Sequence, residues 1–432
     1  MPPRFRKSSA DAPSGYFAWE AAGLRWLREA STALRRLVRG AGPGGRGALP
    51  MSVPGVPPLL VDAFGARWWL DTDGLGSPVA ERVRALWARA EVPERAGGDT
   101  DVLPFTLGRE DEAVLIAGAR YRIGDDALPY AVSRALTVAS LERRMGDCLL
   151  LHAAGLARPD GTTLALVAAS GTGKTTSARV LGRSFGYVSD ETVAIEDDLS
   201  VRAHPKPLSI VVDPASPHDK EERSPDELGL LVAPDALRLG GVVVLDRDPA
   251  AGEPSLTPLS LVEAAVAVVP QTSALLRMPD PMGALARALT AGGGPWRLTY
   301  AEIDRCRDLL VHALDAVRDE PATWEVEAGD GGVDERPEAC APPALDPSTV
   351  LGRAPFRHAL HAEGSTLVLV GTVPMALPGM ASTLWRAAQA PRRLADLTEA
   401  AVAGHGRHPR AAEVVAETAA GLVASGAFVV LA

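Results

Sequence analysis

The stretch that decides the fold is Leu164-Ala-Leu-Val-Ala-Ala-Ser-Gly-Thr-Gly-Lys-Thr-Thr176. It begins with an apolar run bounded by small residues, which is typical of a buried, central parallel strand. The glycines that follow allow successive backbone N–H groups to turn toward an anion at the start of the next helix, which we expect over residues 177–183. The stretch therefore predicts a strand, a phosphate-wrapping loop and a helix, and with them an α/β fold.

The residues of this loop have separate expected tasks. Lys174 is expected to reach the β- and γ-phosphates of a nucleotide, and the hydroxyl of Thr175 is expected to bind Mg²⁺. The full phosphate-binding set is Ser170, Gly171, Thr172, Gly173, Lys174, Thr175 and Thr176. The usual spacing of such loops has glycine at position 168, where this chain has Ala168. The alternative is a glycine-rich turn that merely contains a lysine.

Two adjacent carboxylates, Asp190 and Glu191, interrupt an apolar segment over residues 185–195 that predicts a strand. Carboxylates in such a place are costly unless they are paired or bind a metal. An aspartate at a strand end beside a phosphate loop can polarise a nucleophilic hydroxyl or bind Mg²⁺, while alternation along the strand directs Glu191 to the other face. The alternative is a surface hairpin with two solvated acids.

A single histidine, His152, lies in the apolar segment 149–155. On its own, it is best interpreted as a buried structural histidine. The order of His152, the loop with Lys174 and an acidic pair about sixteen residues later resembles the HPr kinase family, whose members are P-loop kinases related to phosphoenolpyruvate carboxykinase. The loop is equally similar to the carboxykinase version. The resemblance covers residues 148–315.

This resemblance implies a P-loop kinase core with ATP and Mg²⁺ as cofactors. It implies that Asp190 is the general base toward a serine hydroxyl and that His152 lies near it and tunes its protonation. It also implies that Asp190 and Glu191 bind the metal directly or through water. The family's later signature for the reverse, phosphorylase reaction has no convincing copy here, so neither that reaction nor HPr as substrate is predicted.

Two further segments are similar to the family. Residues 204–210 resemble the proline-bounded strand that follows the acidic pair, and residues 241–247 resemble a later core strand that ends in an arginine. Arg247 is therefore a candidate to stabilise charge on a transferred phosphoryl group, because a guanidinium matches phosphate oxygens. The alternative is an exposed arginine in a turn.

Composition indicates a multidomain protein with a substantial core. A chain of 432 residues is too long for one ordinary core, and 47% of its residues are hydrophobic while 23% are charged. The net charge of -10 argues against a nucleic-acid binder. The three cysteines, Cys148, Cys306 and Cys340, have no metal-site or disulfide spacing. With no apolar run long enough to cross a bilayer and no cleavable signal, a cytoplasmic location is expected.

The charge is uneven, since residues 1–50 contain nine basic and three acidic side chains. Within this basic arm, residues 16–39 predict an amphipathic helix that docks on an acidic partner or lies on an anionic membrane surface. The alternative is a helix packed on its own domain. A linker rich in glycine and proline follows over residues 40–58.

Two predicted domains and a linker follow the basic arm. Residues 51–147 predict a small scaffolding α/β domain, with strands at 59–63, 67–71, 102–107 and 113–123 and helices at 78–90 and 127–144. Residues 148–324 form the predicted kinase domain, in which helices at 261–268, 284–289 and 300–317 cover the sheet and a polar loop at 214–226 is either a lid or a plain connection. Residues 325–350 have the composition of a linker.

The last segment, 351–432, predicts paired strands at 356–362 and 366–370, helices at 380–388, 394–403 and 411–425, and a closing strand at 427–431. This winged-helix-like order resembles PqqD-type peptide-recognition domains, on the hydrophobic spacing of residues 365–370, 378–385, 394–397 and 422–430. The resemblance implies that the leader of a ribosomally made peptide adds as a strand to an exposed edge. Alternatives are self-association and, least favoured, DNA binding.

Together the two resemblances predict an ATP-dependent kinase that phosphorylates a serine or threonine hydroxyl of a peptide or small protein, in modification of a ribosomal peptide natural product. The alternatives are a nucleotide-binding regulator or scaffold without phosphoryl transfer, and a kinase of a small metabolite. The HPr kinase resemblance also suggests a homo-oligomer.

Overall fold

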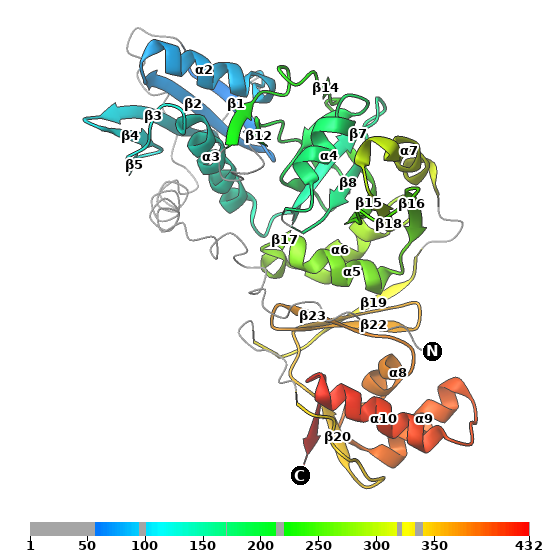
Figure 1. Ribbon diagram of the computed structural model, residues 1–432. Helices are drawn as coiled ribbons and strands as arrows, with labels where there is room; N and C mark the ends of the chain where they lie inside the picture. Colours follow the sequence, from blue (N-terminus) through cyan, green and yellow to red (C-terminus); the bar gives the residue numbers. More distant parts are fainter. Residues whose placement is uncertain are drawn as a thin grey trace. The chain divides into compact units, whose positions relative to one another are not determined.

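The computed structural model describes residues 57–94, 101–169, 171–212, 220–317, 322–332 and 340–431. The expected basic arm, residues 1–50, and Ser170 lie outside the described residues. The chain divides into two compact units, which are drawn in Figure 1 and described separately below. Unit 1 takes the described residues of Met1–Thr257, Gln271–Pro281 and Ala291–Ala316, and unit 2 takes those of Pro258–Pro270, Met282–Thr290 and Val317–Ala432.

Unit 1 begins with a five-stranded sheet. In spatial order its strands are β1 (Leu59–Ala63), β2 (Ala66–Gly74), β3 (Leu103–Glu110), β4 (Ala113–Ile116) and β5 (Ala119–Tyr121). Helices α2 (Ser77–Trp87), η1 (Ala88–Ala90) and α3 (Leu128–Arg144) share one apolar core with this sheet. The strand expected at 113–123 is split, because Ala117 and Gly118 have positive φ and reverse the chain.

A seven-stranded sheet carries the phosphate-loop sequence. Its spatial order is β14 (Leu231–Val232), β9 (Gly186–Ser189), β7 (Ala153–Ala157), β8 (Thr162–Val167), β15 (Arg238–Arg247), β18 (Trp296–Tyr300) and β16 (Ser255–Pro258). Strand β8 is parallel to β15 but antiparallel to β7. It is therefore central, as expected, but not parallel to both neighbours, because the short turn from Arg158 to Gly161 joins β7 and β8 as a hairpin.

Unit 1 also contains a four-stranded sheet. Its spatial order is β11 (Val201–Arg202), β10 (Val193–Ile195), β6 (Leu149–Leu151) and β17 (Thr272–Ser273). The single strand expected over 185–195 is wrong, since β9 and β10 belong to different sheets. Strand β6 pairs with β10, and β7 pairs with β9. The chain thus passes from one sheet to the other at His152 and again at residues 190–192, and the pairing makes these two crossings neighbours.

The rest of unit 1 surrounds these sheets. Its remaining elements are α4 (Lys174–Leu181), β12 (Leu208–Val211), β13 (Lys220–Arg223), η3 (Leu275–Arg277), η4 (Ile303–Cys306) and α7 (Arg307–Asp315). The short helix η2 (Val269–Gln271) spans the chain boundary between the two units. The helix expected over 300–317 is shorter, because Tyr300 ends β18 and α7 begins only at Arg307. Of the polar loop expected at 214–226, residues 214–219 lie outside the described chain and residues 220–223 form β13, which pairs with β12.

Unit 2 contains two small sheets and five helices among its described residues. One sheet has the order β19 (Trp324–Ala328), β21 (His358–Ala362), β22 (Ser365–Val370) and β23 (Val373–Leu377), and the other has the order β24 (Arg392–Arg393), β20 (Val350–Arg353) and β25 (Phe428–Leu431). The helices are α5 (Leu261–Val268), α6 (Pro281–Leu289), α8 (Met380–Ala387), α9 (Leu394–His405) and α10 (Ala411–Ala424). The order of three helices and a closing strand agrees with the sequence.

Helix α5 contradicts one expectation. Residues 261–268 were expected to cover the kinase sheet, but α5 contacts β21, β22 and β23 of unit 2. Glu363 and Gly364 form the positive-φ turn between β21 and β22, and the Glu363 carboxylate accepts a hydrogen bond of 3.2 Å from the backbone N–H of Leu261. A carboxylate at a helix N-terminus is favourable, so this turn helps to hold α5 on the C-terminal sheet. Helix α6, expected at 284–289 as a second cover, also belongs to unit 2.

The linker expected over 325–350 begins with a strand instead. Strand β19 pairs with β21 in antiparallel register from Trp324 opposite Ala362 to Ala328 opposite His358. Its sequence alternates apolar Trp324 and Val326 with Glu325 and Glu327, which is the period of a half-buried strand. The acidic residues and the glycines that follow masked this signal. The proposed domain boundaries themselves stay predictions.

Within the described part of the chain, no helix is long and apolar enough to cross a membrane.

Candidate active site

The phosphate-loop sequence forms the turn that its glycines predict. Gly171 and Gly173 have φ angles of 81° and 100°, and α4 starts at Lys174 with Gly173 as its N-cap. A side chain on either glycine would meet open space, so it is the backbone angle, and not crowding, that requires glycine here. The loop therefore carries backbone N–H groups into the start of a helix, which is the geometry that binds anions.

The ammonium group of Lys174 is folded back onto this loop. Its Nζ donates hydrogen bonds to the backbone oxygens of Ala168 at 2.7 Å and Ala169 at 3.0 Å. The residue is 7% exposed, and burial lowers the pKa of Lys174 to about 8, although the charges of Glu191 and Asp190 raise it. Lys174 is thus a poorly hydrated cation held by neutral carbonyls and within electrostatic reach of both acidic residues. An incoming phosphate would stabilise its charge.

The two threonines at the start of α4 differ in exposure. Thr175 is partly buried and Thr176 is exposed. Thr172, in the loop itself, donates its hydroxyl to the backbone oxygen of Ala169 at 2.6 Å. This hydrogen bond stabilises the turn before the helix begins.

Asp190 follows directly after β9 and is buried, with a side chain 3% exposed. Its Oδ1 lies 3.2 Å from the Nζ of Lys206 and accepts a hydrogen bond of 3.2 Å from the hydroxyl of Tyr187. The alternative of two solvated acids on a surface hairpin is therefore wrong for Asp190. Burial of a carboxylate is tolerated here because a cation and a hydroxyl neutralise and solvate it.

Glu191 does not point to the opposite face from Asp190, which corrects the sequence expectation. Its Oε2 lies 3.4 Å from the same Nζ of Lys206, and its side chain is 43% exposed. The strand ends at Ser189, whose hydroxyl accepts hydrogen bonds from the backbone N–H groups of Glu191 and Thr192 at 3.3 and 3.2 Å. Because these residues form a turn, the alternation of strand side chains no longer applies to them.

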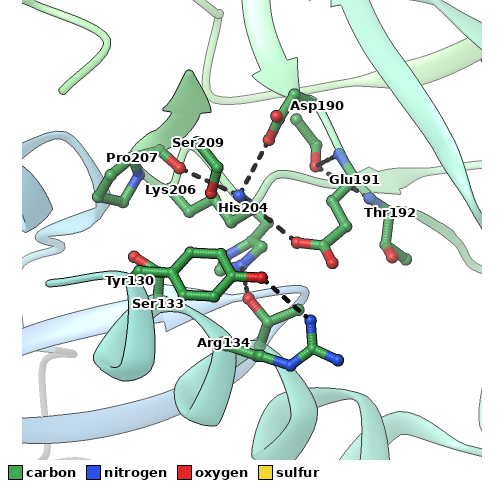
Figure 2. Close-up of polar contacts among 12 residues, drawn as sticks. Tyr130, Ser133, Arg134, Asp190, Glu191, Thr192, His204, Lys206, Pro207 and Ser209 are labelled. Carbon is green, nitrogen blue, oxygen red and sulfur yellow. Dashed lines mark hydrogen bonds and ion pairs between the residues drawn. The ribbon is translucent and has the colours of Figure 1, made fainter. Parts of the chain in front are cut away.

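Lys206 is the central residue of this cluster, and sequence reasoning missed it. It is 3% exposed, its Nζ also donates to the backbone oxygen of Pro207 at 3.0 Å, and Figure 2 shows it between the two carboxylates. Burial lowers the pKa of Lys206, but Asp190, Glu191 and Glu222 outweigh burial and raise it above its usual value. The available signal was a lysine between two prolines, Pro205 and Pro207, in the segment that resembled the strand after the acidic pair.

The pKa of Glu191 is set by its burial and by nearby basic side chains. Burial raises the pKa of Glu191, but Lys206, His152 and Arg134 together lower it below its usual value. Arg134 comes from α3, and its Nη1 lies 3.4 Å from the hydroxyl of Tyr130 on the same helix. The N-terminal segment, which was expected to be mainly a scaffold, therefore brings an arginine within electrostatic reach of Glu191.

A second buried carboxylate, Glu222 on β13, links this cluster to α3. It accepts hydrogen bonds from Ser133 at 2.9 Å and from Ser209. Burial raises the pKa of Glu222, while Lys206 opposes this rise. The Lys206 ammonium thus lies in the field of three carboxylates.

His152 lies at the crossing between β6 and β7, close to Glu191 as the strand pairing requires. Its backbone N–H donates to the oxygen of Gln271 at 2.7 Å. Burial and the charge of Lys174 lower the pKa of His152, while Glu191, a hydrogen bond with Gln271 and Asp190 raise it. The structure therefore brings together His152, Lys174, Asp190 and Glu191, which were selected from the sequence.

Arg247 has a different environment from the expected one. It ends β15, whose carboxyl end lies at the same sheet edge as that of the parallel strand β8. Its Nε donates to the backbone oxygen of Ala301 at 3.1 Å, and its Nη2 pairs with Glu302 at 3.2 Å, with half of the side chain exposed. The contacts seen for Arg247 are thus those of an exposed arginine, the alternative interpretation.

The oxygen donors at this site suit a magnesium ion that arrives with a nucleotide. Thr175, Asp190 and Glu191 offer the hard oxygen ligands that Mg²⁺ prefers. Among the described residues, no group of three or more histidine, cysteine, aspartate or glutamate side chains could hold a metal by itself. The residues therefore fit a metal that keeps phosphate and water ligands, and they do not form a cage for a resident ion.

No family model matches the chain, and no curated protein matches it. Among solved structures, the Hpr(Ser) kinase/phosphatase from Coxiella burnetii is similar, with 11% sequence identity, a TM-score of 0.23, and coverage of 38% of this chain and 92% of that chain.

Proposed function

We propose that this protein is an ATP-dependent kinase with Mg²⁺ as its metal. The observation that carries the proposal is the joint position of two charged groups, a buried lysine at the end of a phosphate-type loop and a buried aspartate at the end of β9, a strand of the same sheet as β8. The charge of Asp190 acts on Lys174, which begins helix α4, and Asp190 directly follows β9, the next strand in the chain. Phosphoryl transfer needs a cationic cradle for the triphosphate and a base for the acceptor within one site.

In the proposed reaction, the loop N–H groups and Lys174 hold the phosphates, and Thr175 and Glu191, with Asp190 directly or through water, hold the metal. Magnesium, when bound with ATP, neutralises phosphate charge. Asp190 accepts the proton of an acceptor hydroxyl while the acceptor oxygen forms a bond to the γ-phosphorus and the bond to ADP breaks. His152 tunes the charge balance of the acidic pair and Lys174.

The acceptor that we propose is a serine or threonine hydroxyl of a peptide or small protein, bound through unit 2 in modification of a ribosomal peptide. Support comes from the outermost strand β25 of the second small sheet. Val429, Val430 and Leu431 are all more than a third exposed on this strand. Consecutive exposed apolar residues on an edge strand suit the addition of an extended peptide.

The experiment is mass spectrometry of a candidate precursor peptide after incubation with the protein, ATP and Mg²⁺. An added phosphate on serine or threonine supports the proposal. Nucleotide binding with no phosphorylated product favours a regulator or scaffold instead, and phosphate transfer to small hydroxyl compounds but not to peptides favours a metabolite kinase. Asp190→Asn is the matched variant, since it keeps the size of the side chain, and we expect ATP binding without turnover. Turnover by this variant would exclude Asp190 as the base.

A further inference from the structure

The buried contacts of Asp190 show a division between its two oxygens. Both contacts seen for it among the described residues are made by Oδ1, one with the Lys206 ammonium and one with the Tyr187 hydroxyl. The same Tyr187 hydroxyl lies 3.2 Å from the backbone oxygen of Lys206. Two donors on one oxygen hold Oδ1 in place, so Oδ2 is the oxygen that remains for an acceptor.

Lys206 is itself held firmly. Its ammonium has oxygen partners from Asp190, Glu191 and Pro207 at 3.0 to 3.4 Å, and its side chain is 4% exposed. The backbone that carries it is anchored by His204, whose N–H donates to the oxygen of Val188 on β9 at 3.0 Å. A buried lysine whose ammonium has several oxygen partners is held in one conformation, whereas an exposed lysine can change partners.

We propose that Lys206 is a positioning residue for Asp190, which orients the carboxylate and presents Oδ2 to the acceptor hydroxyl. This inference rests on the proposed kinase function. Lys206 does not take up or release the proton; it holds Oδ1, while Oδ2 accepts the proton of the acceptor as the bond to the γ-phosphorus forms and ADP leaves. The adjacent ammonium charge disfavours a direct metal ligand at Oδ1, as it does at Oε2 of Glu191, so Asp190 would contact the metal only through water and its Oδ2 is left for the proton.

The test uses the full chain and water as the acceptor, so that no peptide needs to be known. Phosphate release from ATP and Mg²⁺ is measured for wild type, Lys206→Met, Asp190→Asn and the double variant. We expect Lys206→Met to lower kcat about 10- to 100-fold, less than the roughly 100- to 10,000-fold contribution of a general base itself because the base is still present, with the KM for ATP changed less than about threefold. Lys220→Met, at an exposed lysine on β13, is the control and should leave both values unchanged.

The double variant separates positioning from a structural role. If Lys206 acts through Asp190, adding Lys206→Met to Asp190→Asn should lower kcat less than about twofold further, whereas independent effects would multiply. The double variant removes the charges of Lys206 and Asp190 together and leaves one unpaired carboxylate fewer than Lys206→Met alone, so it should fold better than that variant. Where Lys206→Met does not fold, Tyr187→Phe removes only the second donor on Oδ1 and is expected to lower kcat about threefold or more at unchanged KM.

The outcomes of the two proposals are distinguishable. A Lys206→Met protein with wild-type kcat, beside an inactive Asp190→Asn protein, would overturn the positioning role and leave the kinase intact, and so would multiplicative losses in the double variant. Wild type that neither releases phosphate from ATP nor phosphorylates a peptide would overturn the proposed function, and the inference with it. Partial recovery of kcat by Lys206→Arg would support positioning, because the charge is restored with altered geometry.

Discussion

Lys174 and Lys206 lie in one site but in opposite electrostatic environments. Lys174 is surrounded by neutral carbonyl oxygens, and its pKa falls to about 8, whereas Lys206 faces carboxylates and its pKa rises. The difference follows from the charge of the partners, since both side chains are similarly buried. A cation without an anionic partner in contact is available to a phosphate, while one already paired is not. The two lysines are therefore suited to different tasks.

Replacement of the available lysine should abolish transfer and keep the fold. We expect Lys174→Ala to lower ATP-dependent phosphate release at least about 100-fold, because the task of the lysine is electrostatic stabilisation of the phosphates. Its lost contacts are two hydrogen bonds to loop carbonyls, so the circular dichroism spectrum should be unchanged. A variant with normal activity would refute the assignment.

The buried His204 makes a prediction about acid stability. It is fully buried, contacts Thr137 at 3.1 Å and lies against Phe64 with ring centroids 4.3 Å apart, and burial, with the charge of Lys206, lowers its pKa to about 3. Between pH 6.5 and about 3, His204 binds a proton in the unfolded chain but stays neutral in the folded chain. The free energy of unfolding therefore falls as the pH falls through this window. The loss is up to about 1.4 kcal/mol per pH unit.

Urea unfolding midpoints at pH 7.5, 6.5 and 5.5 measure this effect. His204→Gln cannot gain a charge, so its midpoint should fall less steeply between pH 6.5 and 5.5 than that of wild type. Equal slopes for the two proteins would show that another group causes the acid sensitivity.

At the scale of elements, the turn before α4 depends on backbone conformation. Gly173 has φ of 100°, a region that residues with a Cβ rarely adopt, yet a Cβ there would contact nothing. We expect Gly173→Ala to distort the loop and weaken ATP binding about tenfold or more, at a cost in stability of about 1–2 kcal/mol. Calorimetric titration with ATP measures this.

Gly252→Ala is the matched control, since that glycine also has open space around it but no positive φ. It should bind ATP like wild type. If Gly173→Ala binds ATP equally well, the strained turn is not part of the nucleotide site.

At the scale of the whole molecule, the chain does not separate into consecutive domains. Helices α5 and α6 lie within the sequence of the predicted kinase domain but belong to unit 2, and α5 contacts strands β21 to β23. A truncation at about residue 350 would remove the strands that α5 contacts, and α5 carries the buried apolar residues Leu261, Val262 and Val268. It would also remove β21, the partner of β19.

We therefore expect the protein truncated at residue 350 to aggregate, because several apolar side chains of α5 lose their cover. Size-exclusion chromatography and thermal unfolding measure this against the full chain. A monodisperse fragment with the wild-type midpoint would show that α5 has another cover.

Much of the local structure was predictable. Apart from the strand expected at 113–123, which is split into β4 and β5, the strands and helices of residues 59–144, the turn around Gly173 and the closing three helices agree with short-range patterns of apolar spacing and glycine. The predictions that were wrong concern elements whose position depends on contacts with segments far away in the sequence. The partner of α5 depends on strands about a hundred residues later, and the break between β9 and β10 depends on which sheet each strand joins.

The sequence by itself determined the strand, loop and helix around Lys174, because glycine conformation and apolar periodicity act over a few neighbouring residues. It also indicated that Asp190 and Glu191 need a partner, because buried carboxylates must be neutralised. Only the tertiary structure decided that this partner is Lys206, and that β6 and β7, paired with β10 and β9, bring His152 to the same place. The physical reason is that charges pair through space. The distance between two residues along the sequence does not show which segments the sheets bring together.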